Sequence, residues 1–162
     1  MSTQENLMAA FAGESQANRK YLAFAKIAEK EGKKGLAKLF RVAAEAETIH
    51  ALKHLENAGV PKDSIGNLKM AIEGETHEFT SMYPGFITEA ESEENGVAKI
   101  GFTWANAVEK EHEKLFSEAL EKNGEIEEKE YYICPFCGHP EIGEAPEKCP
   151  ICGAPKNSFY KI

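Results

Sequence analysis

The feature that most restricts how this chain can fold is the polar centre of an otherwise apolar helix face. In "LFRVAAEAETIH", residues 39–50, apolar residues recur at helical spacing, which predicts a helix with one buried face. Followed from Leu36 in steps of three and four residues, that face reaches Glu47 and then His50. A charged carboxylate in a core is costly unless it is paired or bound to a cation. The helix therefore needs a partner for these side chains at its midpoint.

The same pattern recurs in all four helices that the sequence predicts. They run from about Thr3 to Gly32, from just after Gly35 to just before Gly59, from just after Asn67 to about Glu94, and from Val97 to Lys122. Each helix has a seam that is apolar at both ends and carries glutamate or histidine in the middle. The residues at the midpoints are Glu14, Glu47, His50, Glu75, Glu78, Glu109 and His112. Pro84 lies inside the third helix, where it removes one backbone hydrogen bond and predicts a bend.

Five glutamates and two histidines at one level cannot satisfy each other by hydrogen bonds alone, so the pattern predicts bound divalent cations. A Glu-x-x-His pair places both side chains on one helix face, one turn apart. In di-iron carboxylate bundles, two helices each supply such a pair and the other two each supply a glutamate. The pairs here are Glu47 with His50 and Glu109 with His112, and the single glutamates are Glu14 and Glu75. Glu78 is one carboxylate more. Oxygen and imidazole ligands suit iron or manganese.

A short internal repeat relates the two halves of the helical region. "AFAGES" at 10–15 is similar to "AIEGET" at 71–76, and the Glu-x-x-His pair also occurs twice. This predicts two related helical hairpins facing each other across a pseudo-twofold axis. Tyr21 and Tyr83 follow the first glutamate of each half by seven and eight residues, about two turns. Either tyrosine could be ordinary core or a hydrogen-bond donor to ligating carboxylates.

All four cysteines lie near the C-terminus, as Cys134-x2-Cys137 and Cys149-x2-Cys152. Two such pairs can enclose one tetrahedral metal with four thiolates. The spacing suits iron, which would carry one electron, and equally zinc, which would only hold the fold. The surrounding sequence is rich in proline and glycine, as expected for a small loop-rich module, and a charged linker, "EIEEKE", precedes it.

Composition excludes several classes of function. The net charge of −8 with no basic run argues against nucleic acid or an anionic membrane as a partner. No segment approaches the ~18 consecutive apolar residues of a membrane span. The N-terminus has no basic flank and apolar stretch of a signal peptide. Cysteines clustered for metal binding in such a chain lead us to expect the cytoplasm.

Together, "FAGES", "EGETHEFTSMYPGF", the two Glu-x-x-His pairs and "CPFCG…CPICGAP" resemble the rubrerythrin family over essentially the whole chain. The resemblance implies an all-α, ferritin-like four-helix bundle over 1–124, a linker over 125–130 and a small, loop-rich β rubredoxin-like domain over 131–162. It implies two non-haem irons in the bundle and one iron in the four-cysteine site. The implied activity is reduction of hydrogen peroxide to water, with electrons from NAD(P)H through a separate reductase or rubredoxin.

The resemblance also implies roles for individual residues. The implied iron ligands of the bundle are Glu14, Glu47, Glu75, Glu109 and His112, with Glu47 and Glu109 bridging. His50 and Glu78 would be alternatives at one iron, exchanging with its oxidation state. Tyr21 and Tyr83 match the family's hydrogen-bonding tyrosines. One departure is His139-Pro140, because the first cysteine pair is often followed by an aromatic residue. That departure puts the potential of the iron–cysteine centre in doubt.

Chain geometry predicts how the bundle assembles. In a ferritin-like bundle the second and third helices run parallel, so the segment between them must return along the bundle. With helix ends near Asn57 and Asn67, the connecting segment of about ten residues would have to span roughly 27 Å along the bundle. Its fully extended length is about 33 Å. This is barely sufficient. We therefore predict a domain-swapped homodimer, in which helices one and two of one chain pair with helices three and four of another.

Two other functions use the same residues. An iron-handling protein would oxidise ferrous iron in the bundle as ferritins do, but it has no evident need for an attached electron carrier. A scaffold with a zinc ribbon would do no chemistry. The metal in the four-cysteine site distinguishes these readings, since oxidised iron there is red and zinc is colourless.

Overall fold

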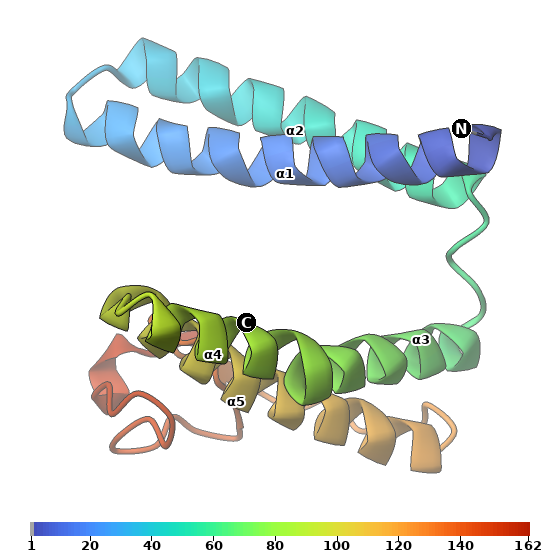
Figure 1. The fold of residues 1–162 in the computed structure, drawn as a ribbon, viewed down its shortest axis with the longest axis vertical. Helices are drawn as coiled ribbons and strands as arrows, with labels where there is room; N and C mark the ends of the chain where they lie inside the picture. The colour runs from blue at the N-terminus through green and yellow to red at the C-terminus, as the bar shows by residue number, and fades with distance from the viewer. Residues whose placement is uncertain (1) are drawn as a thin grey trace. The chain divides into compact units, whose positions relative to one another are not determined.

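The computed structural model describes residues 2–162, and its first two helices form an antiparallel hairpin, hairpin one. α1 spans Thr3–Lys30 and α2 spans Lys34–Asn57 (Figure 1). α1 begins at a capping box, in which the Ser2 hydroxyl accepts from the backbone N–H of Glu5. Small side chains let the two helices approach closely. The buried residues between them are Ala25, Ala28, Ala37, Ala44 and Ala51.

Hairpin two is built from a long interrupted helix and one continuous helix. α3 (Ser64–His77), a π-helix η1 (Glu78–Met82) and α4 (Tyr83–Ser92) follow one another without a break, and α5 (Gly96–Glu121) packs beside them (Figure 1). The π-helix thus directly precedes the segment that contains Pro84, where the sequence predicted a bend. Tyr83 and Pro84 start α4 directly after the π-helix, so the missing N–H of proline falls where the hydrogen-bond pattern of the helix changes.

The start of the third helix was predicted wrongly. It begins at Ser64 rather than after Asn67, because the Asp63 carboxylate accepts a hydrogen bond from the backbone N–H of Gly66 at 2.6 Å and caps the helix. The segment between the hairpins is therefore residues 58–63, shorter than the ten residues expected. Gly59, with φ of +67°, ends α2 in the left-handed conformation that glycine adopts without strain.

The C-terminal residues form a small module around the cysteines. Three short antiparallel strands lie in the order β2-β1-β3: β1 spans Tyr131–Ile133, β2 spans Pro140–Ile142 and β3 spans Tyr160–Lys161. A 3₁₀ turn, η2, covers Lys156–Ser158. The core of the module consists of Cys134, Cys149 and Ala154 with Ile151 and Phe159 against them. The thiols thus make up much of this core.

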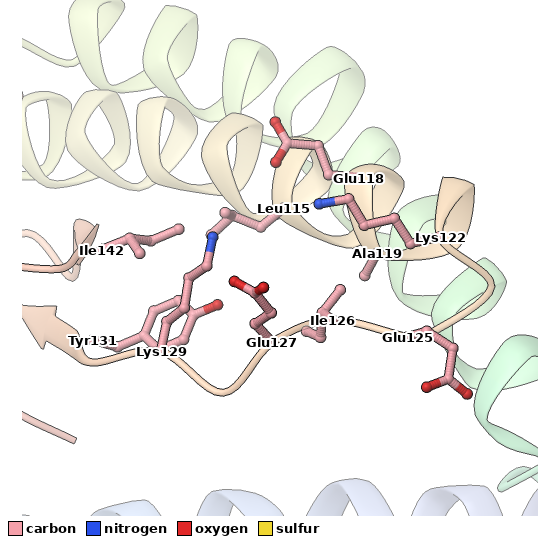
Figure 2. Close-up of a pocket in the computed structure, with 10 residues that line it drawn as sticks. All are labelled: Leu115, Glu118, Ala119, Lys122, Glu125, Ile126, Glu127, Lys129, Tyr131 and Ile142. Carbon is pink, nitrogen blue, oxygen red and sulfur yellow. The ribbon is translucent and has the colours of Figure 1, made fainter.

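The charged residues before β1 run beside the C-terminal half of α5. They leave a hollow of about 330 Å³ between chain and helix. Figure 2 shows Ile126 directed from this segment towards α5, with Glu125 directed away from it. Ile126 is the single apolar residue of this otherwise charged connection, and it is still 53% exposed.

The chain divides into two compact units. One consists of the residues up to Lys62, which contain hairpin one, and the other is Asp63–Ile162, which contains hairpin two and the cysteine module. None of the helices in the described part of the chain is long and apolar enough to cross a bilayer. The expected class, helical hairpins of a ferritin-like fold followed by a small β module, is confirmed.

Candidate metal centres

Hairpin one brings together three of the predicted ligands, which we call the N-terminal triad: Glu14, Glu47 and His50. Glu14 comes from α1 and the other two from α2, and one ligand atom of each lies within 4.8 Å of the others. Nδ1 of His50 is 2.9 Å from Oε2 of Glu47. Within this unit the His50 side chain is 56% exposed and the Glu47 side chain 19%. The imidazole therefore sits at the outer edge of the triad.

Hairpin two holds an equivalent C-terminal triad: Glu75 from α3 with Glu109 and His112 from α5. Nδ1 of His112 lies 2.7 Å from Oε2 of Glu109 and 3.7 Å from Oε2 of Glu75. Partial burial and then the nearby charge of Glu109 raise the pKa of Glu75, while His112 opposes the rise. Two neighbouring carboxylates repel each other when both are ionised, and a bound cation would neutralise this repulsion.

Two aromatic clusters extend the equivalence of the hairpins beyond the triads. They are formed by Tyr21, Phe24 and Phe40 in hairpin one and by Tyr83, Phe86 and Phe102 in hairpin two. In both clusters the two phenylalanine ring centroids are 5.5 Å apart, and the tyrosine ring is 6.2–6.3 Å from each. Both tyrosines predicted from the sequence therefore belong to packed aromatic groups. Each tyrosine lies about two helical turns from the first glutamate of its triad.

Glu78 stands apart from both triads. It is the first residue of η1 and half-buried. Burial first, and then the charges of Glu109, Glu78 and Glu75, raise the pKa of the Tyr83 hydroxyl. Ionisation of that hydroxyl is thus even less favourable than in an ordinary tyrosine, and it is available as a hydrogen-bond donor near these carboxylates.

Asn18 of α1 was not among the site residues predicted from the sequence. Its Nδ2 donates to the backbone carbonyl of Ala44 at 2.7 Å and to the Thr48 hydroxyl at 2.8 Å. These bonds tie α1 to α2 beside the N-terminal triad, because Asn18 follows Glu14 by one turn and Thr48 is next to Glu47. The available signal was an amide one turn after Glu14 on the same helix face, because an amide needs a partner when it is buried.

The four cysteines converge as predicted, and none forms a disulfide. Sγ of Cys134 is 3.5 Å from Sγ of Cys152, and the sulfurs of Cys137 and Cys149 are also 3.5 Å apart. A disulfide requires about 2.05 Å. Tetrahedral thiolates about 2.3 Å from a metal would be separated by roughly 3.8 Å, so these four sulfurs fit a single tetrahedral ion.

The protein environment acts differently on individual thiols. Burial raises the pKa of Cys137 and of Cys152. Burial opposes ionisation of Cys134 too, but the backbone N–H groups of Cys137 and Phe136 donate to its sulfur and lower its pKa. Backbone donors of this kind also stabilise metal-bound thiolates.

Comparison with known proteins finds matches for both the helical region and the cysteine module. Residues 5–120 match the family model described as rubrerythrin, and residues 132–160 match the rubrerythrin rubredoxin-like domain. Nigerythrin of Nitratidesulfovibrio vulgaris is 38% identical, over 98% of this chain and 85% of its own length. Rubrerythrin-2 of Clostridium acetobutylicum is 36% identical, over 97% of this chain and 95% of its own. A solved structure of mixed-valence nigerythrin, 37% identical, matches all of this chain and 87% of its own with a TM-score of 0.59.

Proposed function

Because the chain belongs to the rubrerythrin family, whose members are generally peroxide-reducing di-iron oxidoreductases, we propose that it reduces hydrogen peroxide to water in its helical region. The donor sets fit the cofactors of the family: two non-haem irons for the triads and one iron for the four cysteines. Iron bound at the triads would supply the two electrons that, with two protons, convert one peroxide into two waters. The observation that carries the proposal is the pair of equivalent triads in one chain with a four-thiolate site.

The side chains in and around the triads would have different roles in this reaction. The proposed ligands are Glu14, Glu47, His50, Glu75, Glu78, Glu109 and His112. His50, exposed at the edge of its triad, and Glu78, outside either triad, are the two that could exchange at one ion without disturbing the others. A carboxylate favours the harder ferric ion and imidazole the ferrous ion. The Tyr83 hydroxyl, whose ionisation is disfavoured by burial and by nearby carboxylates, would donate a hydrogen bond to peroxide. Tyr21 would do so from the other hairpin.

We propose residues 131–162 as the electron relay, joined through 125–130 to a bundle formed by residues 1–124. Electrons would come one at a time from an external NAD(P)H-dependent reductase or a rubredoxin. Thiols held for a metal, with no disulfide among them, favour a reducing compartment such as the cytoplasm.

The length of the connection supports a domain-swapped homodimer in a family that is typically dimeric. Glu47 precedes the end of α2 by about 15 Å of helix, and Ser64 precedes Glu75 by about 16 Å. If both triads lie at one level, the connection must climb roughly 31 Å. The seven steps from Asn57 to Ser64 reach about 25 Å at full extension. One chain cannot bridge that distance, so each bundle would combine hairpin one of one chain with hairpin two of its partner.

Replacement of Glu109 with alanine tests the activity. It removes a carboxylate from the C-terminal triad but no residue from the helix cores, so we expect unchanged helical circular dichroism and loss of peroxide turnover. Glu73→Ala, an exposed glutamate on α3, is the matched control and should turn over peroxide normally. Unchanged turnover in the Glu109 variant would exclude this site. Ferric iron accumulating in the wild type, without return of electrons from the relay, would favour the iron-handling alternative.

A further inference from the structure

A second apolar face runs along α2, separate from the face that carries Glu47. Its four large side chains are 59–63% exposed, although hairpin one buries the alanines between its helices. Three of the four lie about 140–160° around the helix from Glu47, at about 100° per residue. The face therefore points neither at the ligands nor at α1. We call it the α2 stripe: Leu39, Val42, Ile49 and Leu52.

The equivalent face of hairpin two already has a cover. Glu109 follows Glu47 by 62 residues, so Ile49 and Leu52 of the stripe correspond to Glu111 and Lys114 of α5. Those two residues line a crevice together with residues of the cysteine module. The module of the chain thus lies along α5, and among the residues described in hairpin one nothing covers the stripe. A cover for the stripe has to come from another molecule.

The spacing of the stripe is the same in both directions along the helix. Leu39 and Val42 are three residues apart, as are Ile49 and Leu52. Two copies of α2 can therefore be laid antiparallel about a two-fold axis that crosses the helix just before Ala46. Leu39 of one copy then lies beside Leu52 of the other, and Val42 lies beside Ile49. Each contact occurs twice, as in an isologous interface.

A hollow beside one end of the stripe fits this pairing. It has a volume of about 190 Å³ and lies between α1 and α2, with Phe11, Ala51 and Leu52 among its walls. The antiparallel pairing places Leu39 of the second copy opposite it. Leu39 is the most exposed of the four side chains, at 63%. Each copy thus offers one projecting leucine and one hollow to receive the other copy's leucine.

The charges beside the stripe also permit a second copy to approach. A chain with a net charge of −8 repels itself, yet the stripe is flanked by three lysines and two glutamates: Lys34, Lys38, Lys53, Glu45 and Glu56. The pairing brings Lys34 of one copy beside Glu56 of the other. Lys38 meets Lys53, whose ammonium group is bonded to Glu56 of its own helix at 2.8 Å.

The same pairing accounts for the short connection between the hairpins. In a ferritin-like bundle α3 runs parallel to α2, so in an exchanged dimer α3 of one chain would run parallel to the partner's α2. Antiparallel stripes would set Asn57 level with Lys34 of the second copy, and triads at one level would set Ser64 within about 3 Å of that height. The connection then needs a sideways step of roughly 20 Å, about two helix spacings, within its reach of about 25 Å.

We propose that the α2 stripe is an interaction surface for a second copy of this chain, whose own stripe pairs with it antiparallel about a two-fold axis at Ala46. The proposal goes beyond the peroxide activity and adds to the exchange of hairpins which faces of the two chains meet. Four side chains bury less than the ~800 Å² per partner of a standard interface. The stripe therefore acts between chains that the exchanged hairpins already hold together.

A cysteine at the axis tests the pairing directly. Ala46→Cys places two thiols across the axis, within reach of a disulfide. Iron-loaded protein at low concentration, treated with oxidised glutathione, should give at least about tenfold more disulfide-linked dimer than Ala23→Cys does. Ala23, an exposed alanine on α1, is the matched control. The wild type reports any linkage through the four native cysteines.

A charge pair tests the antiparallel register. Val42→Glu, added to the Ala46→Cys chain, should lower the yield of linked dimer at least about fivefold, because it sets a carboxylate against Ile49 of the other copy. Adding Ile49→Lys should restore the yield, since the new carboxylate and the new ammonium group then face each other twice across the axis. Val42→Thr replaces Val42→Glu if that variant loses helical circular dichroism, and it should lower the yield by a smaller factor.

Three results would overturn the proposal. They are a yield in Ala46→Cys no higher than in Ala23→Cys, a yield that Val42→Glu leaves unchanged, and no recovery when Ile49→Lys is added. Binding of the wild type to phosphatidylcholine vesicles, without linkage of Ala46→Cys, would overturn it in favour of a lipid surface. Peroxide turnover enters none of these measurements, so the pairing can fail while the proposed function stands.

Discussion

The backbone N–H of Tyr83 donates to the carbonyl of Glu78, five residues earlier, instead of four as in an α-helix. This bond belongs to the π-helix η1, and it explains a difference between the two hairpins. Tyr83 follows Glu75 by eight residues, whereas Tyr21 follows Glu14 by seven, yet both tyrosines sit in aromatic clusters with nearly identical distances between ring centroids. The wider turn absorbs one extra residue. Glu78, the carboxylate without a counterpart in hairpin one, begins that turn.

Deleting Thr80 should therefore separate the stability of hairpin two from its activity. The deletion restores the seven-residue spacing, so a regular α-helix can keep both the triad and the aromatic cluster in place. We expect thermal stability equal to or above that of the wild type, with peroxide turnover reduced at least about tenfold because the turn that follows Glu78 is lost. Circular dichroism, melting curves and peroxide consumption provide the comparison.

Deletion of Arg19 from α1 is the matched control. It shortens a spacing that is already seven and should misalign Tyr21 with its cluster, which lowers the melting temperature. If deletion of Thr80 left turnover unchanged, the π-helix would have no part in the site.

The ligand-bearing seams could be predicted because helical periodicity and the cost of buried charge are local properties of the sequence. The π-helix was not predicted, although the spacings of seven and eight residues were visible, because both approximate two turns. The start of α3 was missed because Gly66 and Asn67 resemble a helix break, whereas the cap at Asp63 depends on one hydrogen bond.

The raised pKa of Glu75 predicts that metal-free protein becomes more stable on mild acidification. A carboxyl group whose pKa is higher in the folded than in the unfolded state destabilises the fold when it is ionised. Stability should therefore rise as the pH falls from 7 through the folded pKa of Glu75, which lies above 4.5. Glu75→Gln should raise the melting temperature of metal-free protein at pH 7 and flatten this dependence. With metal bound the preference should reverse, because the cation neutralises the carboxylate. A Glu75→Gln variant less stable than the wild type without metal would contradict this account.

Asn18→Ala should destabilise hairpin one by about 1–3 kcal/mol, since it removes both hydrogen bonds by which the Asn18 amide joins α1 to α2. Urea unfolding of metal-free protein measures the change. Thr48→Val removes the hydroxyl that accepts from Asn18 and donates to the Ala44 carbonyl, but it leaves the bond from Asn18 to Ala44 between the helices, so it should cost less. If both variants lost the same free energy of unfolding, the hydrogen bond from Asn18 to Ala44 would add no stability of its own.

Lengthening the connection at residues 58–63 should convert the proposed swapped dimer into a monomer. Insertion of about ten Gly/Ser residues after Val60 extends the reach beyond the roughly 31 Å climb, at an entropic cost of only about 1 kcal/mol. Light scattering should then reveal a monomeric species that still binds two irons in its helices. Replacing the existing connection by Gly/Ser without lengthening it is the control and should remain dimeric. A lengthened chain with no monomer, even on dilution, would argue against exchange of hairpins.

Removing iron from the cysteine module should unfold that module and leave the helices intact. Two of its core side chains, Cys134 and Cys149, are themselves thiol ligands, and a segment this short buries too little apolar surface to fold without its metal. Burial raises the pKa of Cys137 and Cys152, so uptake of metal must release protons and should weaken as the pH falls. Competition with a chelator between pH 6 and pH 8 measures this slope, while strand signals in NMR spectra report folding of the module. Sharp strand signals in metal-free protein would show that apolar packing alone holds the module together.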